Sequence, residues 1–206
     1  ARSAFAEGVP GGQQILRDYL AELPARIAAA VKSADGGRRP ARISTATGRE
    51  ERLAFNRRFF MLDGTVGWNP GKLNPRIVRP AGPTDPAVPV VLVDGLDGKP
   101  IACYVNFAMH LDTVGGLYYS ADYPYTLSKA LAAVKGDGLV TVFTIGCAGD
   151  INHVNVSSPA PQKGHGEAAR IGTRRAAEAL RTLEKLDPVA DGPGGASSLT
   201  AELPLG

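Results

Sequence analysis

The sequence predicts an α/β fold, a mixed β-sheet flanked by helices, with a long loop rich in proline and glycine. Three observations predict it. Apolar runs typical of strands alternate with helical patterns in the second half of the chain. Another helical pattern occupies residues 13–34. Between them, residues 63–89 hold six of the 16 prolines and four of the 25 glycines, together with Asp-Gly and Asn-Pro pairs, which favours a loop over regular structure.

The composition excludes several classes of protein. Hydrophobic residues make up 44% of the chain and charged residues 21%, which argues against intrinsic disorder. The net charge is +3 and no basic run is interleaved with aromatic residues, so we expect no nucleic-acid partner. No apolar stretch has the length of a transmembrane segment, and no signal peptide is visible. We expect residues 1–206 to form a single α/β domain.

The first half of the chain predicts one helix and one strand. In residues 13–34, apolar side chains recur at three- and four-residue steps and share one face. These side chains are Leu16, Tyr19, Leu20, Leu23, Ile27 and Val31. Pro24 is expected to kink this helix or split it in two, and Gly36 and Gly37 are expected to end it. Residues 41–47 are expected to form a short strand.

The second half predicts strands and helices in alternation. Residues 90–93 and 101–107 are expected to be neighbouring strands joined by an Asp-Gly-rich turn. Residues 124–134 have helical spacing, with a proline in the first turn. Residues 139–145 predict a buried strand. Residues 166–186 predict a helix whose small side chains favour close packing against the sheet.

Three polar clusters interrupt the apolar runs, at residues 106–112, 120–124 and 146–153. The first and third follow strands, where open α/β sheets bind their ligands, and the second precedes a helix. His110 is a candidate metal ligand or general base. Asp122 and Asp150 are candidates to orient that histidine, ligate a metal or hold a water. Gly149 allows the backbone to approach a ligand closely.

Each of these positions also has a purely structural interpretation. His110 fits a hydrogen-bonded residue after a strand, Asp122 fits a helix N-cap, and residues 146–150 fit a tight turn. The sequence has no HExxH motif and no Cys/His pair at zinc spacing, so motif spacing alone closes no metal site. Cys103 fits a small buried apolar residue, and a disulfide between Cys103 and Cys147 stays open.

The order of several segments resembles a known family. The segments are AFNRRFFMLDGT (54–65), NPRIVRPAGPTDPAVPVVLVD (74–94), VNFAMHLDTVGG (105–116), SADYP (120–124) and GCAGDINHVNV (146–156). Together they resemble the N-terminal catalytic domain of the neutral/alkaline (non-lysosomal) ceramidases, and more narrowly an uncharacterised bacterial branch of that superfamily. The resemblance implies that this chain is the central part of a larger catalytic domain in a periplasmic or secreted protein.

The resemblance also implies a chemistry, because the family is a zinc-dependent amidohydrolase that cleaves an N-acyl bond of a lipid-like substrate. His110 matches a zinc-ligating histidine, and the remaining zinc ligands are implied to lie outside this chain. Arg57 matches an arginine that lines the active site, and Asp150 matches an acidic residue of the catalytic loop. With Arg57, Asp122 and Gly149 are the candidate substrate-binding residues.

The sequence departs from the family at one important position. Ceramidases carry a serine two residues after the matching aspartate, in a GDxSPN context, whereas this chain has Asn152, followed by His153 in place of proline. Asparagine cannot replace serine in acyl transfer, although its amide can donate to an oxyanion. The candidate catalytic residues are therefore Asp150, Asn152 and His153.

The sequence supports two main functional hypotheses. The first is a zinc-dependent hydrolase of an amide (N-acyl) or ester bond in a small-molecule or lipid-like substrate, with Asp150 or His153 as the proton carrier and Asn152 at the oxyanion. The alternative is a non-catalytic ligand-binding module that keeps the fold without the serine. A third hypothesis, a metal-free α/β enzyme that handles carbohydrate or phosphate, leaves His110 without a role. The sequence does not indicate an oligomeric state.

Overall fold

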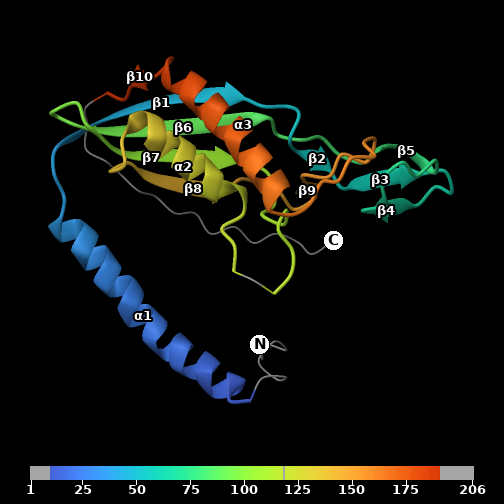
Figure 1. The fold of residues 1–206 in the computed structure, drawn as a ribbon, viewed down its shortest axis with the longest axis horizontal. Coiled ribbons are helices and arrows are strands. Elements are labelled where there is room, and N and C mark those ends of the chain that lie inside the picture. Colours follow the sequence, from blue (N-terminus) through green and yellow to red (C-terminus); the bar gives the residue numbers. More distant parts are fainter. Residues whose placement is uncertain (1–9, 118, 191–206) are drawn as a thin grey trace, which may run out of the picture. The chain divides into compact units, whose positions relative to one another are not determined.

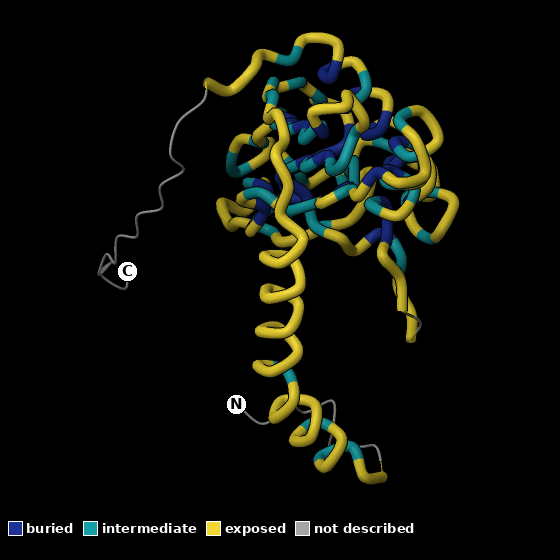
Figure 2. Tube along the Cα trace, turned by 90° about the vertical axis from the view of Figure 1, so that its left-hand side faces the viewer, coloured by how far each residue is buried: buried dark blue, intermediate teal, exposed yellow. Residues whose placement is uncertain are grey.

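The computed structural model describes residues 10–117 and 119–190, and it divides the chain into two compact units, Ala1–Pro40 and Ala41–Gly206 (Figure 1). In the described residues of the first unit, 10–40, the chain forms the helix α1 (Gly12–Gly36). Pro24 lies in the middle of this helix, which is continuous, so the predicted split does not occur; Figure 2 shows a bend partway along it. Gly37 forms the C-cap, as the sequence predicts. None of the helices in the described ranges has the length and hydropathy to cross a membrane.

The second unit is built on a mixed five-stranded sheet. Its strands are β1 (Ala41–Arg49), β6 (Ala87–Gly95), β7 (Pro100–Phe107), β8 (Val140–Ile145) and β10 (Asp187–Pro188), in the order β10-β1-β6-β7-β8. Strands β7 and β8 are parallel and the other neighbours are antiparallel. The β6–β7 pair is the predicted hairpin, closed by the Asp-Gly-rich turn, and the mixed sheet is confirmed.

Two helices cover one face of this sheet, α2 (Tyr123–Lys135) and α3 (His165–Leu183) (Figure 1). The buried side chains of the central strands point toward them, because alternate residues of a strand lie on one face. This core includes Val90, Leu92, Cys103, Val105 and Phe107, and Figure 2 shows the buried stretches gathered inside this unit. Burial raises the pKa of the Cys103 thiol to about 11, consistent with its predicted role as a small apolar residue. Cys103 and Cys147 are both free thiols.

The predicted long loop at residues 63–89 is wrong. This segment contributes β4 (Val66–Trp68), β5 (Ile77–Pro80) and the start of β6, and both short strands pair with β3 (Arg58–Met61) in a second, three-stranded antiparallel sheet. Gly64 and Gly71 lie in the turns between strands, with φ of 80° and 90°, whereas Gly67 lies within β4. Strands of only three or four residues fit between closely spaced prolines and glycines. A segment rich in turn-forming residues can therefore still form a sheet.

The strand at residues 139–145 forms as β8, but it is not buried as predicted. It lies at the edge of the five-stranded sheet, and Val140 and Val142 on its outer face are 58% and 45% exposed. The β-branched residues of this segment predict a strand, but they do not indicate whether the strand lies at the centre or at the edge of the sheet. A short two-stranded pair, β2 (Phe55–Asn56) with β9 (Ile151–Asn152), joins the segment before the small sheet to the segment after β8.

Candidate functional site

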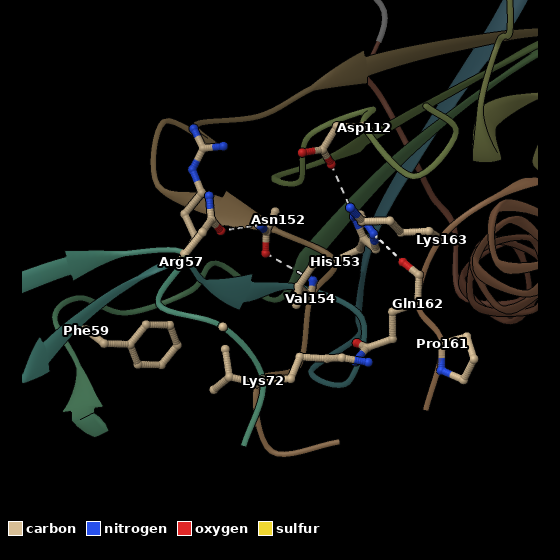
Figure 3. A pocket seen from close by; sticks show the side chains of 13 residues that line it. Arg57, Phe59, Lys72, Asp112, Asn152, His153, Val154, Pro161, Gln162 and Lys163 are labelled. Atoms are coloured by element: carbon tan, nitrogen blue, oxygen red, sulfur yellow. Dashed lines mark hydrogen bonds and ion pairs between the residues drawn. The ribbon is translucent and has the colours of Figure 1, made fainter. Parts of the chain in front are cut away.

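A cavity of about 620 Å³ lies beside the small sheet, and residues from three separate segments line it (Figure 3). The segment around β3 and β4 contributes Arg57, Phe59, Asn69, Gly71 and Lys72. The loop after β7 contributes Asp112. The segment from the end of β9 to the start of α3 contributes Asn152, His153, Val154, Val156, Pro161, Gln162 and Lys163. The cavity is therefore built mainly by loops that a scaffold of strands holds in place.

Arg57 connects the three segments at one end of the cavity. Its Nη2 donates to the carbonyl oxygen of Gly149 at 2.8 Å and lies 3.3 Å from Nε2 of His110. The guanidinium also lies over the Trp68 ring, 4.2 Å from its centroid, in a cation–π contact. The pairing of β2 with β9 explains this position, because Arg57 follows β2 directly and its backbone N–H donates to the Asp150 carbonyl oxygen at 2.8 Å.

His110 has one ring nitrogen fixed by the backbone. Its Nδ1 lies 2.9 Å from the carbonyl oxygen of Ile151, which can only accept, so Nδ1 carries the proton. In the neutral ring, Nε2 then presents its lone pair toward Arg57. A carbonyl that fixes the tautomer in this way is the usual arrangement behind a metal-ligating histidine. The Nδ1 hydrogen bond thus fixes the tautomer and orientation of the His110 ring, which is the structural interpretation of the sequence, and the predicted metal ligation through Nε2 stays a prediction.

His153 is nearly buried, and both of its ring nitrogens face oxygen acceptors. Its Nδ1 lies 3.1 Å from a carboxylate oxygen of Asp112, and its Nε2 lies 2.7 Å from the carbonyl oxygen of Gln162 (Figure 3). Burial lowers the pKa of His153, but the hydrogen bonds to Asp112 and Gln162 outweigh it, so the net pKa is raised. The hydrogen bond from His153 lowers the pKa of Asp112, against a smaller opposing effect of burial. The two side chains form a hydrogen bond that becomes an ion pair when His153 is protonated, and both pKa shifts favour that state.

The side chains of Asn152 and Asp150 are both held by asparagines. Asn152 donates from Nδ2 to the side-chain oxygen of Asn69 at 3.0 Å, and its own side-chain oxygen accepts from the Val154 N–H at 3.0 Å. Asp150 accepts from Nδ2 of Asn56 at 2.7 Å. Asn152 lines the cavity, whereas Asp150 is not among the lining residues.

Asp122 caps helix α2 and does not line the cavity. One carboxylate oxygen accepts from the Tyr123 N–H at 2.7 Å, and the other accepts from the Val114 N–H at 2.8 Å. The residue has a φ of 54°, an uncommon conformation for a residue other than glycine. In the structure, Asp122 therefore pins the loop at residue 114 to the start of α2, which is the N-cap interpretation of the sequence.

The structure thus brings together part of the predicted set. Arg57 contacts both His110 and Gly149, and Asn152 and His153 line the same cavity as Arg57. Sequence reasoning missed other lining residues that carry charge or polarity, namely Asn69, Lys72, Asp112, Gln162 and Lys163. For Asp112 a signal exists, because it lies two residues after His110 in the same polar cluster. The lysines have no local signal, since exposed lysines are common on any surface.

His110 offers one candidate metal-ligating atom, its Nε2. Within residues 10–117 and 119–190, no group of three His, Cys, Asp or Glu side chains is arranged to hold a metal ion. Nε2 of His110 has the tautomer that a zinc ligand needs, because Nδ1 donates to the Ile151 carbonyl oxygen, but Nε2 lies 3.3 Å from Nη2 of Arg57, so a bound metal would replace that contact.

No family model matches this sequence, and no curated protein sequence does. The structure is similar to that of the neutral ceramidase from Pseudomonas aeruginosa, with a TM-score of 0.57 and 19% identity over 77% of this chain and 25% of the ceramidase. It is also similar to a structure of ceramidase complexed with C2, with a TM-score of 0.54 and 19% identity over 71% of this chain and 23% of that one. This chain thus spans about a quarter of the ceramidases it matches, and the predicted resemblance is confirmed as a shared, ceramidase-like α/β fold.

Proposed function

We propose that this chain is the central part of a zinc-dependent hydrolase that cleaves an amide (N-acyl) or ester bond. The observation that carries the proposal is His110, whose Nδ1 is fixed by the Ile151 carbonyl oxygen while Nε2 faces Arg57. The ceramidase-like fold supports it, because His110 lies in the segment whose motif resembles that family. A small-molecule or lipid-like substrate is proposed on the same resemblance.

In this proposal His110 supplies one zinc ligand through Nε2, and the remaining ligands come from residues outside this chain. A bound zinc ion polarises a carbonyl and lowers the pKa of a bound water. Arg57 lies directly beside Nε2 of His110, so its guanidinium is placed to stabilise negative charge that develops on a carbonyl oxygen bound there. We assign this role to Arg57 in preference to Asn152, whose amide is held by Asn69.

Proton transfer is assigned to Asp112 in preference to Asp150. Asp112 lines the cavity, whereas the carboxylate of Asp150 accepts from Asn56 and is not among the lining residues. His153 has no free nitrogen, so we give it a positioning role: it fixes the orientation of Asp112 and balances its charge. A carboxylate held in this way can accept and return a proton without leaving its place.

Metal analysis of the intact protein tests this proposal. We expect close to one zinc per chain in the wild type and a large loss of zinc in His110→Ala, because zinc ligation by the remaining residues would be incomplete. His165→Ala is the matched control, since His165 begins helix α3 and does not line the cavity. Absence of zinc from the wild type, or equal zinc contents in the His110→Ala and His165→Ala variants, would contradict the proposal.

A ligand-binding module without catalysis is the second candidate function. It is favoured by Asn152, which stands where ceramidases have serine and whose amide is already hydrogen-bonded at both ends. Assays of the zinc-loaded protein on N-acyl and ester substrates separate the two candidates. Turnover that depends on His110 supports the hydrolase, whereas zinc binding without turnover of either bond type favours the binding module.

A further inference from the structure

We infer that the cavity beside Arg57 binds a ligand that carries an anionic oxygen group, a carboxylate or a phosphate. The inference deepens the proposed function, since it names the substrate class of the same cavity. It rests on the number, the placement and the lack of charge partners of the cationic side chains that line it. Ceramide, the substrate named by the family resemblance, carries no such charge.

Three basic side chains line the cavity: Arg57 and Lys72 from the segment around β3 and β4, and Lys163 from the segment before α3. Arg57 follows β2, Lys72 lies between β4 and β5, and Lys163 lies just before α3. Figure 3 shows them on different sides of the cavity. In the described part of the chain, the ion pairs between side chains involve none of the three.

The ammonium group of Lys72 is fixed without being neutralised. Its Nζ donates to the carbonyl oxygens of Pro159 and Ala160, at 3.1 and 2.6 Å. Carbonyl oxygens hold the side chain at the rim of the cavity but bring no negative charge. One of the three ammonium donors remains for a ligand, and a lysine so held loses little additional side-chain freedom when it binds an anion.

The guanidinium of Arg57 is also held by neutral groups. It donates to the Gly149 carbonyl oxygen and lies over the Trp68 ring. Its Nε is buried and has no hydrogen-bond partner in the residues that the structure describes. A guanidinium can donate two parallel hydrogen bonds to a carboxylate or phosphate, which would satisfy such a free donor.

Among the described residues, the carboxylate that lines the cavity, Asp112, does not cancel this positive charge. Asp112 is already paired with His153, whose Nδ1 lies 3.1 Å from it. Asp112 makes no ion pair with Arg57, Lys72 or Lys163 among the described residues, and one carboxylate against three basic side chains leaves the cavity positive. A cavity with unpaired charges of one sign attracts ligands of the other sign, and salt screens this attraction.

Direct binding of three small probes tests the inference on the intact protein. Octylphosphonate and octanoate carry the two anionic groups, 1-octanol has the same chain without charge, and none of them contains an amide or ester bond. By isothermal titration calorimetry we expect one or both anions to bind at least about tenfold tighter than 1-octanol. Comparison of octylphosphonate with octanoate distinguishes a phosphate-type ligand from a carboxylate. Equal affinity for all three probes would overturn the inference.

Lysine variants locate the anion. Lys72→Gln and Lys163→Gln should each weaken binding of the preferred anion by about two- to fivefold, the size expected for an exposed charge pair, and leave 1-octanol unaffected. Lys129→Gln is the control, because Lys129 is exposed on α2 and does not line the cavity. Equal losses in all three variants would also overturn the inference, since they would indicate a general charge effect.

These outcomes are separate from those for the hydrolase. Tight, lysine-dependent binding of an anionic probe supports the inference even if no amide or ester is turned over, because no probe has a bond to cleave. Turnover of neutral amides by a protein with no preference for the anionic probes contradicts the inference and leaves the hydrolase proposal standing.

Discussion

His153 shows how a single residue can differ from its expected role. The sequence favours a histidine in this polar cluster as a proton carrier, but both ring nitrogens face acceptors, Asp112 and Gln162. A ring with two acceptors is most stable as the imidazolium, so the pair with Asp112 is held by charge as well as by hydrogen bonds. Because His153 is nearly buried, this pair stabilises the fold around the cavity.

The ion pair gives stability a definite pH dependence. The pKa of His153 is raised, so its contribution is complete below the unfolded value near 6.5 and is lost as the pH rises through the folded value. The pKa of Asp112 is lowered, so its contribution is present above about 3.8 and is lost as the pH falls. We expect NMR titration to place the His153 pKa above 6.5.

The Asp112→Asn variant should lower the pKa of His153. The substitution removes the hydrogen bond to a carboxylate, which is the largest cause that raises this pKa, and burial, which lowers it, then dominates. Asp137→Asn, at an exposed position after α2, is the control and should leave the His153 titration where it is. An unchanged His153 pKa in Asp112→Asn would show that the pair does not form in solution.

At the level of elements, helices α2 and α3 are held together by a close approach at Gly172. A Cβ added there would come within 2.5 Å of the Tyr123 carbonyl oxygen and 2.6 Å of the Thr126 Cβ. The small side chains in residues 166–186 predict close packing against the sheet, whereas the close approach at Gly172 is to helix α2. That approach depends on the crossover from β7 to β8, which places α2 beside α3 on the same face.

Gly172→Ala should therefore destabilise the protein by about 1–3 kcal/mol, because the backbone of α2 would have to move away. Gly166→Ala tests the same substitution in the same helix where no atom lies within 4 Å of the added Cβ. It should be neutral or stabilising by up to about 1 kcal/mol, since alanine favours the helix. Urea denaturation measures both, and equal effects of the two changes would contradict the close packing.

At the scale of the whole α/β unit, the two faces of the main sheet differ. Val105 on the helix-covered face is fully buried, whereas Val142 on the other face is 45% exposed. Val105 lies on β7 and Val142 lies on the adjacent strand β8, so the two positions are the same residue type on neighbouring strands. The difference between them comes from the layer of helices on one face.

Substitution of valine by threonine on each face should show this difference as a difference in the free energy of unfolding. Val105→Thr places an unpaired hydroxyl in the core and should cost about 1–3 kcal/mol. Val142→Thr should change the free energy of unfolding by no more than about 0.5 kcal/mol, because the hydroxyl remains in water. Thermal or urea unfolding of both variants is the measurement. A comparable cost at Val142 would mean that the second face is covered in the intact protein.

The sequence predicts the fold better than it predicts the site. Long periodic segments, such as the helices at 124–134 and 166–186, form close to their expected bounds because their pattern is local. The strands at 66–68 and 77–80 are too short to leave a pattern. His110 and Arg57 are recognised through motifs, but Lys72 and Lys163 reach the cavity by long-range placement of loops, which local sequence does not record.

The cavity and the hydrophobic core share no residue: the side chains that line the cavity lie outside the core cluster of the α/β unit. Mutations that alter the charge of the cavity therefore leave the main core intact, and mutations that repack the core leave the cavity charges in place. Apart from the His153–Asp112 pair, the charged residues of the cavity can therefore change what such a protein recognises without a change in its main core. A family built on this scaffold is expected to diverge in ligand faster than in architecture.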